Sequence, residues 1–542
     1  MPNNHQHYLQ KVENQLLSLS QKDFSLPNRL LNQSEVLLQI LMLDLFPILP
    51  QLLPLYSGRK GGRNHRDPIS MLRSMILMCF YRETSVDRWV IRMHMESELV
   101  IFSGFEQGEI PGVGTFYDFM DRILDGPFEG RPKGYVPPSS RNKGTKGRFL
   151  RNIDLEKEQN KEEEKKMNAN PTEKKIESLV KRILPNLGEP LPRNFQTRLS
   201  SLLMKAVVVP SANMGILGNP NKLSVSTDGS VLKSQAFRHG RKVCECYERN
   251  CDCPRSYSDK DALIGWDSST KKFFLGYRLH LSSAHHNGLT LPIYISINTA
   301  NVHDSVQAVE DIVNLHKQLT FSAIGKVLYR IMDAGYDATY IHFLLRKIGQ
   351  VGIIPFAQSK MNLTSLNSGQ ALDSDGTPLC LGSARMLRHG FHNSTLTTKY
   401  HCPAKLATHR NGKYIRVIRL EQCPHKVLCE PESKMGPIVK IPESENYRHF
   451  GPVPRNSPKW KKLYNLRTGV ERNNSVLKCT HNLGKRPFRR QHRYLIHAHL
   501  VAMYIHTQQW VRHRFGTKRP NTMEEFFQMI SSLAKEHHIT EV

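Results

Sequence analysis

The spacing of apolar residues predicts two structurally different regions in this chain. Through residues 1–125 apolar side chains recur at helical spacing, and Asp67-Pro68-Ile69 opens a strongly apolar helix over 71–81. The segments Thr84-Ser85-Val86-Asp87 and Thr115-Phe116-Tyr117-Asp118 have the capping-box form that starts two more helices. Short helices joined by tight turns are typical of a helix-turn-helix-like DNA-binding region, and equally of a helical bundle without groove contacts.

From Leu223 onward apolar and polar residues alternate, which predicts strands. Three alternating segments, 222–228, 273–281 and 291–297, predict an antiparallel meander. They are followed by a helix that begins at His303-Asp304-Ser305, a buried strand over 326–332, a helix over 340–347 and a strand over 351–356. The order β-β-β-α-β-α-β predicts a mixed sheet of the α+β or α/β class.

A last amphipathic helix is predicted from Tyr464 to Lys478. At ~100° per residue, Tyr464, Arg467, Glu471 and Lys478 fall on one flank, beside an apolar stripe. One interpretation is a surface helix with an Arg467–Glu471 pair at i,i+4. The other is a metal-binding carboxylate between cations that hold phosphates.

Three carboxylates are candidates for a shared metal site. Asp228 ends the first predicted strand and Asp333 the fourth, so they lie side by side if these strands pair. A helix that packs on the sheet brings in Glu471. Carboxylates that converge repel one another unless cations neutralise them, and hard oxygen ligands suit Mg²⁺ or Mn²⁺. Two such ions ~3.5–4 Å apart can promote in-line displacement at a phosphodiester.

Each acidic residue also has an ordinary structural interpretation. Asp228 precedes Gly229, as turn residues do, and Asp333 precedes Ala-Gly, as a helix cap does. Asp337 is an alternative to Asp333, although its position favours a cap. His303 and Asp304 are expected to cap a helix, with a role near the metals as the alternative.

Composition points to a polyanionic partner. The 542 residues include 76 Lys and Arg against 48 Asp and Glu, a net charge of +28, and 39% are hydrophobic, enough for real cores. Nucleic acid is the usual partner and an anionic membrane the alternative. The apolar segment 36–55 is broken by Asp44 and three prolines, and no signal-peptide pattern opens the chain, so a soluble intracellular protein is expected. The DNA-binding interpretation of the first region is favoured by Arg63, Arg66, Arg73, Arg82 and Arg88.

Asp228-Gly-Ser, Asp333-Ala-Gly-Tyr-Asp and the Tyr-two-Arg-three-Glu-six-Lys spacing from Tyr464 to Lys478 resemble the DDE transposases of prokaryotic insertion sequences. The resemblance implies an RNase H-like catalytic core in which Asp228, Asp333 and Glu471 bind two Mg²⁺ or Mn²⁺ ions. It implies DNA contacts by Tyr464, Arg467 and Lys478. It also implies cleavage at terminal inverted repeats and strand transfer into target DNA, by a homodimer on DNA, in a prokaryotic cytoplasm at the nucleoid.

The expected organisation follows from these assignments. It comprises a helical region at 1–125, a charged and Gly/Pro-rich linker at 126–200, core segments at 201–357 and 458–515, an inserted subdomain at 358–457 and a C-terminal tail at 516–542. In related transposases an insertion at this place is rich in strands. A long helix after Lys485 is expected to support the Glu471 helix, and Arg489 and Arg490 before it are candidate DNA contacts.

Cysteines cluster at two places. A loop at 244–253 holds Cys244, Cys246, Cys251 and Cys253, four thiols that either bind a structural Zn²⁺ or remain reduced. Zinc is less expected at the second set, which comprises Cys380, Cys402, Cys423 and Cys429.

Two alternatives to a transposase stay open. A DNA-binding regulator could keep the fold and lose cleavage, although all three carboxylates are present. A metal-dependent nuclease would use the same carboxylates, but the helical region and the long insertion favour recognition of particular DNA ends.

Overall fold

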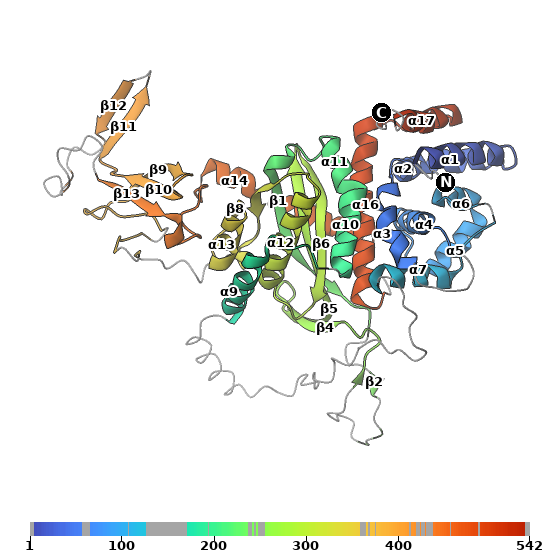
Figure 1. The fold of residues 1–542 in the computed structure, drawn as a ribbon, viewed down its shortest axis with the longest axis horizontal. Helices are drawn as coiled ribbons and strands as arrows, with labels where there is room; N and C mark the ends of the chain where they lie inside the picture. Colours follow the sequence, from blue (N-terminus) through green and yellow to red (C-terminus); the bar gives the residue numbers. More distant parts are fainter. Residues whose placement is uncertain are drawn as a thin grey trace.

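The computed structural model describes residues 5–56, 65–106, 108–125, 171–192, 194–236, 241–242, 245, 247, 255–357, 365–366, 369–373, 376–410, 413–418, 423, 429, 437–455, 457–485 and 488–536. Figure 1 shows N-terminal helices at one end, a central sheet, and a strand-rich insertion at the opposite end.

The central sheet has six strands in a mixed arrangement. They are β1 (Leu223–Lys233), β4 (Leu263–Asp267), β5 (Lys272–His286), β6 (Leu289–Thr299), β7 (Val327–Ile331) and β8 (Val351–Ile353). The order is β4-β5-β1-β7-β8, with β6 also paired to β5. Strands β1, β5 and β6 are antiparallel, while β1, β7 and β8 run parallel. The predicted meander, the pairing of the first and fourth predicted strands, and the RNase H-like mixed sheet are therefore confirmed.

Strand β1 is longer than the sequence pattern predicts. It does not end at Asp228-Gly229 but continues to Lys233, because β5 pairs with it along its whole second half. Its pairing with β7 ends at Ser226. From Thr227 onward one edge of β1 is therefore not covered by β7, and Asp228 lies where this open edge begins.

Helices cover both faces of the sheet. They are α9 (Pro171–Ile183), α10 (Phe195–Leu203), α11 (Val209–Asn213), α12 (Asp304–Phe321), α13 (Thr339–Lys347), α14 (Pro458–Tyr464), α15 (Arg467–Ser475) and α16 (Gln491–Phe515). Helices α9, α12 and α13 share one apolar cluster, whereas α10 and α16 belong to the larger one with β5 and β6. The long helix α16 packs on β6 and, on its other side, on the N-terminal helices (Figure 1). It also contacts the turn Val476–Thr480 that follows the Glu471 helix, and its support of that helix stays a prediction.

The N-terminal region is helical, as predicted. Its helices are α1 (His5–Ser20), α2 (Leu26–Leu41), α3 (Leu49–Leu52), α4 (Pro68–Phe80), α5 (Val86–Met95), α6 (Ser97–Ser103) and α7 (Val113–Asp125). Asp67 caps α4 by accepting from the Ser70 amide at 2.8 Å. The use of Arg73 as support for DNA binding is wrong. Arg73 is buried in α4, and its guanidinium lies 3.6 Å from the centre of the Tyr8 ring. Arg73 is buried because every residue of the largely apolar helix α4 is buried.

Two segments assigned as a linker and as a C-terminal tail contain helices. Residues 171–200, within the expected linker 126–200, contain α9 and the start of α10, so the linker assignment is wrong there. In α9, Ile176 and Val180 are buried among many charges, a narrow stripe that a charge-rich composition conceals. The expected tail at 516–542 contains α17 (Met523–Glu536), which packs against α1 and α2 through Phe526, Ile530 and Leu533.

The insertion is rich in strands, as predicted. It contains β9 (Leu387–His392), β10 (Thr397–His401) and β13 (Ile438–Pro442) in one antiparallel sheet, and a hairpin of β11 (Lys405–Arg410) and β12 (Lys413–Ile418). A two-stranded pair, β2 (Arg241–Lys242) and β3 (Arg255–Ser256), flanks the Cys-rich loop of the core.

In the described part of the chain no single helix is long and apolar enough to cross a membrane, although the bent pair 26–41 and 46–56 meets the length and composition test together.

A buried ion pair holds the insertion to the core. The fully buried Asp337 carboxylate accepts from Arg448 Nε at 3.0 Å, from the Ala357 amide at 3.0 Å, and contacts His342 Nε2 at 3.3 Å. Burial alone would raise the pKa of Asp337, but the hydrogen bonds with His342 and Arg448 lower it well below its usual range. Asp337 therefore connects the start of the insertion, near Ala357, to its end, near Arg448.

We expect Asp337→Asn to weaken this connection by roughly 3 kcal/mol, because it leaves the buried Arg448 guanidinium without its counter-charge. Backbone hydrogen exchange at 351–357 and 448–455 should accelerate. Lys11→Gln, which removes the exposed Lys11–Glu106 pair, should cost less than about 1 kcal/mol and serves as the control. Equal exchange rates at 351–357 and 448–455 in both variants would contradict the role of Asp337 in holding the insertion to the core.

Candidate functional site

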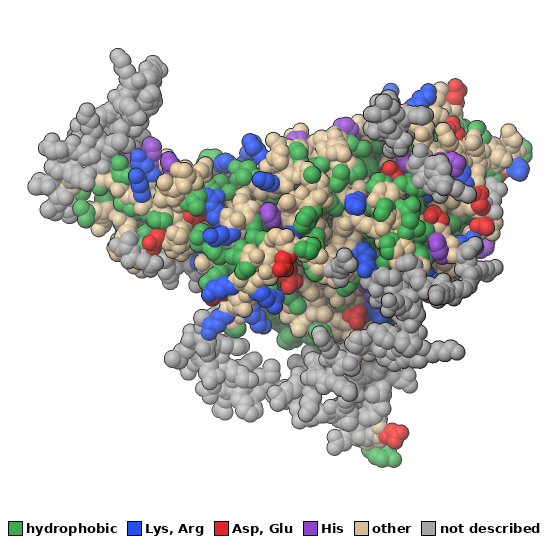
Figure 2. Space-filling model, viewed as in Figure 1, with side chains coloured by type: hydrophobic (Ala, Val, Ile, Leu, Met, Phe, Trp, Pro, Cys, Tyr) green, Lys and Arg blue, Asp and Glu red, His purple; other side chains and the backbone are tan. Residues whose placement is uncertain are grey.

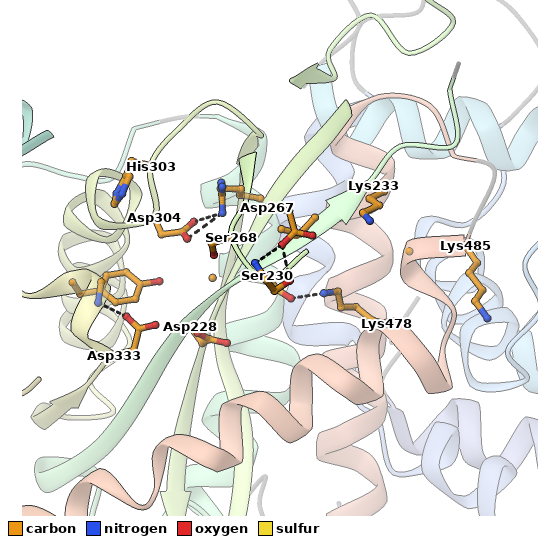
Figure 3. Close-up of a pocket in the computed structure, with 17 residues that line it drawn as sticks. Asp228, Ser230, Lys233, Asp267, Ser268, His303, Asp304, Asp333, Lys478 and Lys485 are labelled. Atoms are coloured by element: carbon orange, nitrogen blue, oxygen red, sulfur yellow. Dashed lines mark hydrogen bonds and ion pairs between the residues drawn. The ribbon is translucent and has the colours of Figure 1, made fainter. Parts of the chain in front are cut away.

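A cleft of about 660 Å³ lies along the open edge of β1 (Figure 3). Asp228 and Asp333 both line it, with Ser230 and Lys233 further along β1 and Lys478 beyond them. Parallel pairing of β1 with β7 brings the two aspartates to this edge although 105 positions separate them in sequence. The cleft therefore joins two of the three predicted carboxylates.

Asp228 is a largely buried carboxylate that lies near other negative charges. Burial raises the pKa of Asp228 to about 6, and the negative charges of Asp333 and Glu471 add to the effect, against Arg467 and His280. Its Oδ2 accepts a hydrogen bond from the Asn474 amide at 3.1 Å, and its Oδ1 lies 4.0 Å from Arg467 Nη1. These partners offset the desolvation of the carboxylate only in part.

Asp333 follows β7 and has the capping role that its sequence context suggested. Its Oδ1 accepts from the Gly335 amide at 2.8 Å and starts a short 3₁₀ turn, Ala334–Tyr336. The turn uses one carboxylate oxygen, while the half-buried side chain still lines the cleft. The structural and the functional interpretation of Asp333 are thus compatible.

Glu471 lies on α15, which packs against β1, β5 and β6. Its Oε1 pairs with Arg467 Nη2 at 2.7 Å, and the same guanidinium reaches Asp228. The i,i+4 pair is therefore present, and it connects Glu471 to the aspartate of β1. Gly469 permits the close packing of α15, since a Cβ there would lie 2.4 Å from Thr290 Oγ1.

The single helix predicted from Tyr464 to Lys478 is wrong. Helix α14 ends at Tyr464, Asn465 and Leu466 form a turn, α15 follows, and residues Val476–Thr480 form a π-helical turn. Tyr464 stacks on Trp460 of α14, with ring centres 4.8 Å apart. Lys478 points to β1, where Nζ donates to Ser230 Oγ at 2.7 Å, and burial lowers the pKa of Lys478. The wider turn removes Lys478 from the flank that Arg467 and Glu471 share, whereas Tyr464 remains within electrostatic reach of both.

A fourth carboxylate, Asp304, lines the cleft but is already compensated. His303 caps α12 as predicted, its Nδ1 accepting from the Ser305 amide at 3.3 Å. Asp304 pairs with Arg278 Nη1 at 3.1 Å and lies 3.5 Å from His280 Nε2. Burial alone would lower the pKa of His280, but Asp304 and Asp311 raise it to about 9, so His280 is a cation at neutral pH.

Gly229 explains why Asp304 can approach β1. A Cβ at Gly229 would lie 2.8 Å from Asp304 Cγ and 2.9 Å from His280 Nε2. Glycine after Asp228 is thus required for close packing within a strand and not for the turn that the sequence suggested.

The sequence interpretation missed two asparagines on the buried face of α15. Asn473 Nδ2 donates to Ser283 Oγ at 3.0 Å, and Asn474 donates to Asp228. Both are buried on the sheet side of the helix, beside Val470 and Leu477. Their positions three and four residues after Val470 were the available signal, because polar residues there must find partners inside.

Arg489 and Arg490 are not among the residues that line the cleft. Arg489 and Arg490 precede α16, and the Arg490 amide donates to Asp259 at 2.8 Å. The four residues Cys244, Cys246, Cys251 and Cys253 lie outside the described residues. Where side chains are described, no three His, Cys, Asp or Glu residues stand close enough to hold one metal ion, and this includes the second cysteine set and the three predicted carboxylates.

The carboxylates nevertheless fit a hard divalent cation by their chemistry. Two of them line one cleft, the third is joined to the first by an arginine, and burial and the charge of Asp333 raise the pKa of Asp228. A divalent cation bound there would offset the negative charge of these carboxylates.

We expect Asp228→Asn to stabilise the protein in metal-free buffer. The pKa of Asp228 rises from 3.8 to about 6 on folding, so the folded protein binds its proton more tightly, and stability falls as pH rises through this window. Asparagine keeps the shape without the charge and should raise the free energy of unfolding by roughly 1–3 kcal/mol at neutral pH. Denaturant unfolding at about pH 5 and about pH 8 should show the larger gain at the higher pH.

The exposed Asp118→Asn variant is the control and should change stability equally little at both values of pH. An Asp228→Asn protein no more stable than the wild type at the higher pH would show that the carboxylate is fully compensated.

Comparisons with known proteins identify the family of this chain. Residues 235–505, which are 271 of the 542 residues, match the family described as Transposase DDE domain; Asp333 and Glu471 fall inside the match and Asp228 seven residues before it. No curated protein matches the chain. Among solved structures, the Mos1 transposase paired-end complex with left transposon end is similar at 13% identity, over 55% of this chain and 80% of that one, with a TM-score of 0.15 that supports no inference. On the match over half of its length, the chain belongs to the family of transposases with a DDE domain.

Proposed function

We propose that this transposase binds the ends of an insertion sequence and catalyses metal-dependent DNA cleavage and strand transfer. The observation that supports the proposal best is the electrostatic state of Asp228: a largely buried carboxylate, opposed by Asp333 and Glu471, at the open edge of a strand. Transposases of this family generally use divalent metal ions. Asp228, Asp333 and Glu471 would hold two Mg²⁺ or Mn²⁺ ions, which, when bound, supply positive charge to the attacking and leaving oxygens of a phosphodiester.

The chain's own residues position the DNA in this scheme. Arg467 offers a guanidinium between Asp228 and Glu471, and we assign it a phosphate oxygen next to the metals. Lys478, fixed by Ser230, would hold a second phosphate. Asn474 keeps Asp228 in its orientation by donating to Oδ2. Tyr464, Arg489 and Arg490 remain proposed DNA contacts.

The partners follow from the same scheme and from charge. Figure 2 shows more Lys and Arg than Asp and Glu on one face of the molecule, in keeping with the net charge of +28. We propose terminal inverted repeats and target DNA as ligands, a homodimer on DNA as the active form, and a prokaryotic insertion sequence, working at the nucleoid in the cytoplasm, as the source. The zinc site at Cys244–Cys253 stays a prediction.

DNA carrying the inverted repeats that flank the gene tests the proposal. We expect Mg²⁺-dependent cleavage at the repeat ends. Asp333→Asn and Glu471→Gln should each lower the cleavage rate by more than about a hundredfold. Loss of a residue that only supports a metal ligand costs about 10- to 100-fold, and loss of the ligand itself should cost more. Binding to the same DNA, measured in Ca²⁺, should persist in both variants. Glu524→Gln, an exposed carboxylate on α17, is the matched control and should cleave normally.

The outcomes separate the alternatives. Specific binding without cleavage in Mg²⁺ or Mn²⁺ would favour a DNA-binding regulator. Cleavage that ignores the repeats would favour a nuclease. Full activity of Glu471→Gln would remove Glu471 from the site.

A further inference from the structure

The cleft at the open edge of β1 has two chemically different ends (Figure 3). The carboxylates Asp228, Asp304 and Asp333 lie at one end. At the other end lie three lysines, Lys233, Lys478 and Lys485, each from a different segment. Ser230 lies between the two groups. Only Lys478 belongs to the signature spacing on which the proposed DNA contacts rest.

The three lysines have no ion-pair partner among the described residues. The one carboxylate at this end is Asp267, whose Oδ1 accepts from the Ser269 amide at 3.1 Å, from Ser269 Oγ at 2.6 Å and from the Thr270 amide at 3.4 Å. It is thus engaged by its own turn. Three positive charges against one negative charge leave the lysine end with an excess of two.

The fold holds these lysines around one space. Lys233 is the last residue of β1, and Gln235 just after it donates to the Gly484 carbonyl at 2.9 Å, which ties the loop that carries Lys485 to the end of the strand. Lys478 is fixed by its hydrogen bond to Ser230. Lys233 and Lys485 themselves are exposed, so their ammonium groups can reach a ligand without a large desolvation cost.

We propose that Lys233 and Lys485 form a subsite for the backbone phosphate that neighbours the scissile phosphodiester on the same DNA strand. This rests on the proposed function, in which the scissile phosphate lies at the carboxylates. A nucleic-acid strand carries anions at regular short intervals, so a strand that passes Asp228 and Ser230 brings its next phosphate to the lysine end. Single phosphate ions do not explain why both ends share one continuous cleft of this size. The subsite fixes the direction in which the cleaved strand crosses β1.

Salt dependence of DNA binding measures the contact. A short fluorescent duplex that carries the terminal repeat is the probe, in Ca²⁺ so that binding is observed without cleavage. Lys233→Gln and Lys485→Gln should each lower the slope of log affinity against log salt concentration by about 0.9, and the double variant by about twice that. Lys205→Gln is the matched control, because Lys205 is exposed and does not line the cleft. If Lys233→Gln and Lys485→Gln change the slope no more than Lys205→Gln does, the proposal is overturned.

Neutral phosphates locate the contact. Methylphosphonate replaces one phosphate at a time along the cleaved strand. The loss caused by Lys233→Gln and Lys485→Gln should disappear only when the phosphate next to the scissile one is neutral; a loss that is the same at every position overturns the subsite. If the wild type cleaves in Mg²⁺ while both lysine variants match Lys205→Gln, this inference fails alone. If the wild type never cleaves although the lysine effect maps to one phosphate, the cleavage proposal fails and the phosphate subsite stands.

Discussion

Repulsion between carboxylates at the open edge of β1 is the constraint around which the site is built. Asp228 is largely buried, and the charges of Asp333 and Glu471 oppose its ionisation further. A lone buried carboxylate would accept a proton or be replaced during evolution of a stable fold, since burying an unpaired charge is costly. Here the fold enforces the proximity, because β1 and β7 pair side by side and α15 packs over β1.

The surroundings of the cleft show which charges the fold compensates and which it does not. Asp304 receives Arg278 and the His280 cation, and Asp337 receives Arg448. Behind β1, the buried Arg330 donates from Nη1 to Thr227 Oγ1 at 3.1 Å and from Nε to Gln350 at 3.2 Å. Asp304 and Asp337 thus each have a charged partner within 3.5 Å. Asp228, by contrast, accepts one hydrogen bond from the side-chain amide of Asn474 and lies 4.0 Å from the Arg467 guanidinium. Incomplete compensation is not confined to Asp228, because burial also lowers the pKa of Arg330 and of Arg73, and each of these guanidinium groups has a buried nitrogen without a hydrogen-bond partner among the described residues.

The sequence predicted the parts of this structure whose side chains repeat with a clear period. Alternation located β5 and β6, the cap at His303 located α12, and the paired aspartates followed from strand order. It did not predict the extent of β1, because pairing with β5 is a tertiary contact that overrides the turn signal of Asp228-Gly229. It missed α9 because two buried residues, Ile176 and Val180, carry the packing of a helix that is otherwise charged.

The helix that carries Glu471 shows why a correct motif can have an incorrect geometry. On a regular α-helix, seven residues after Glu471 return almost to the same flank, so Lys478 would compete with Arg467 for the same carboxylates. The π-helical turn at Val476–Thr480 rotates Lys478 away, and it bonds to Ser230 of β1 instead. Tyr464, before the turn at Asn465–Leu466, stacks on Trp460 and remains within electrostatic reach of Arg467. The π-helical turn thus divides the signature into an arginine beside the carboxylates and a lysine toward the opposite end of the cleft. If the proposed function holds, this division would place a cation on each side of the phosphodiester that is cut, which suits a strand with a phosphate at every nucleotide.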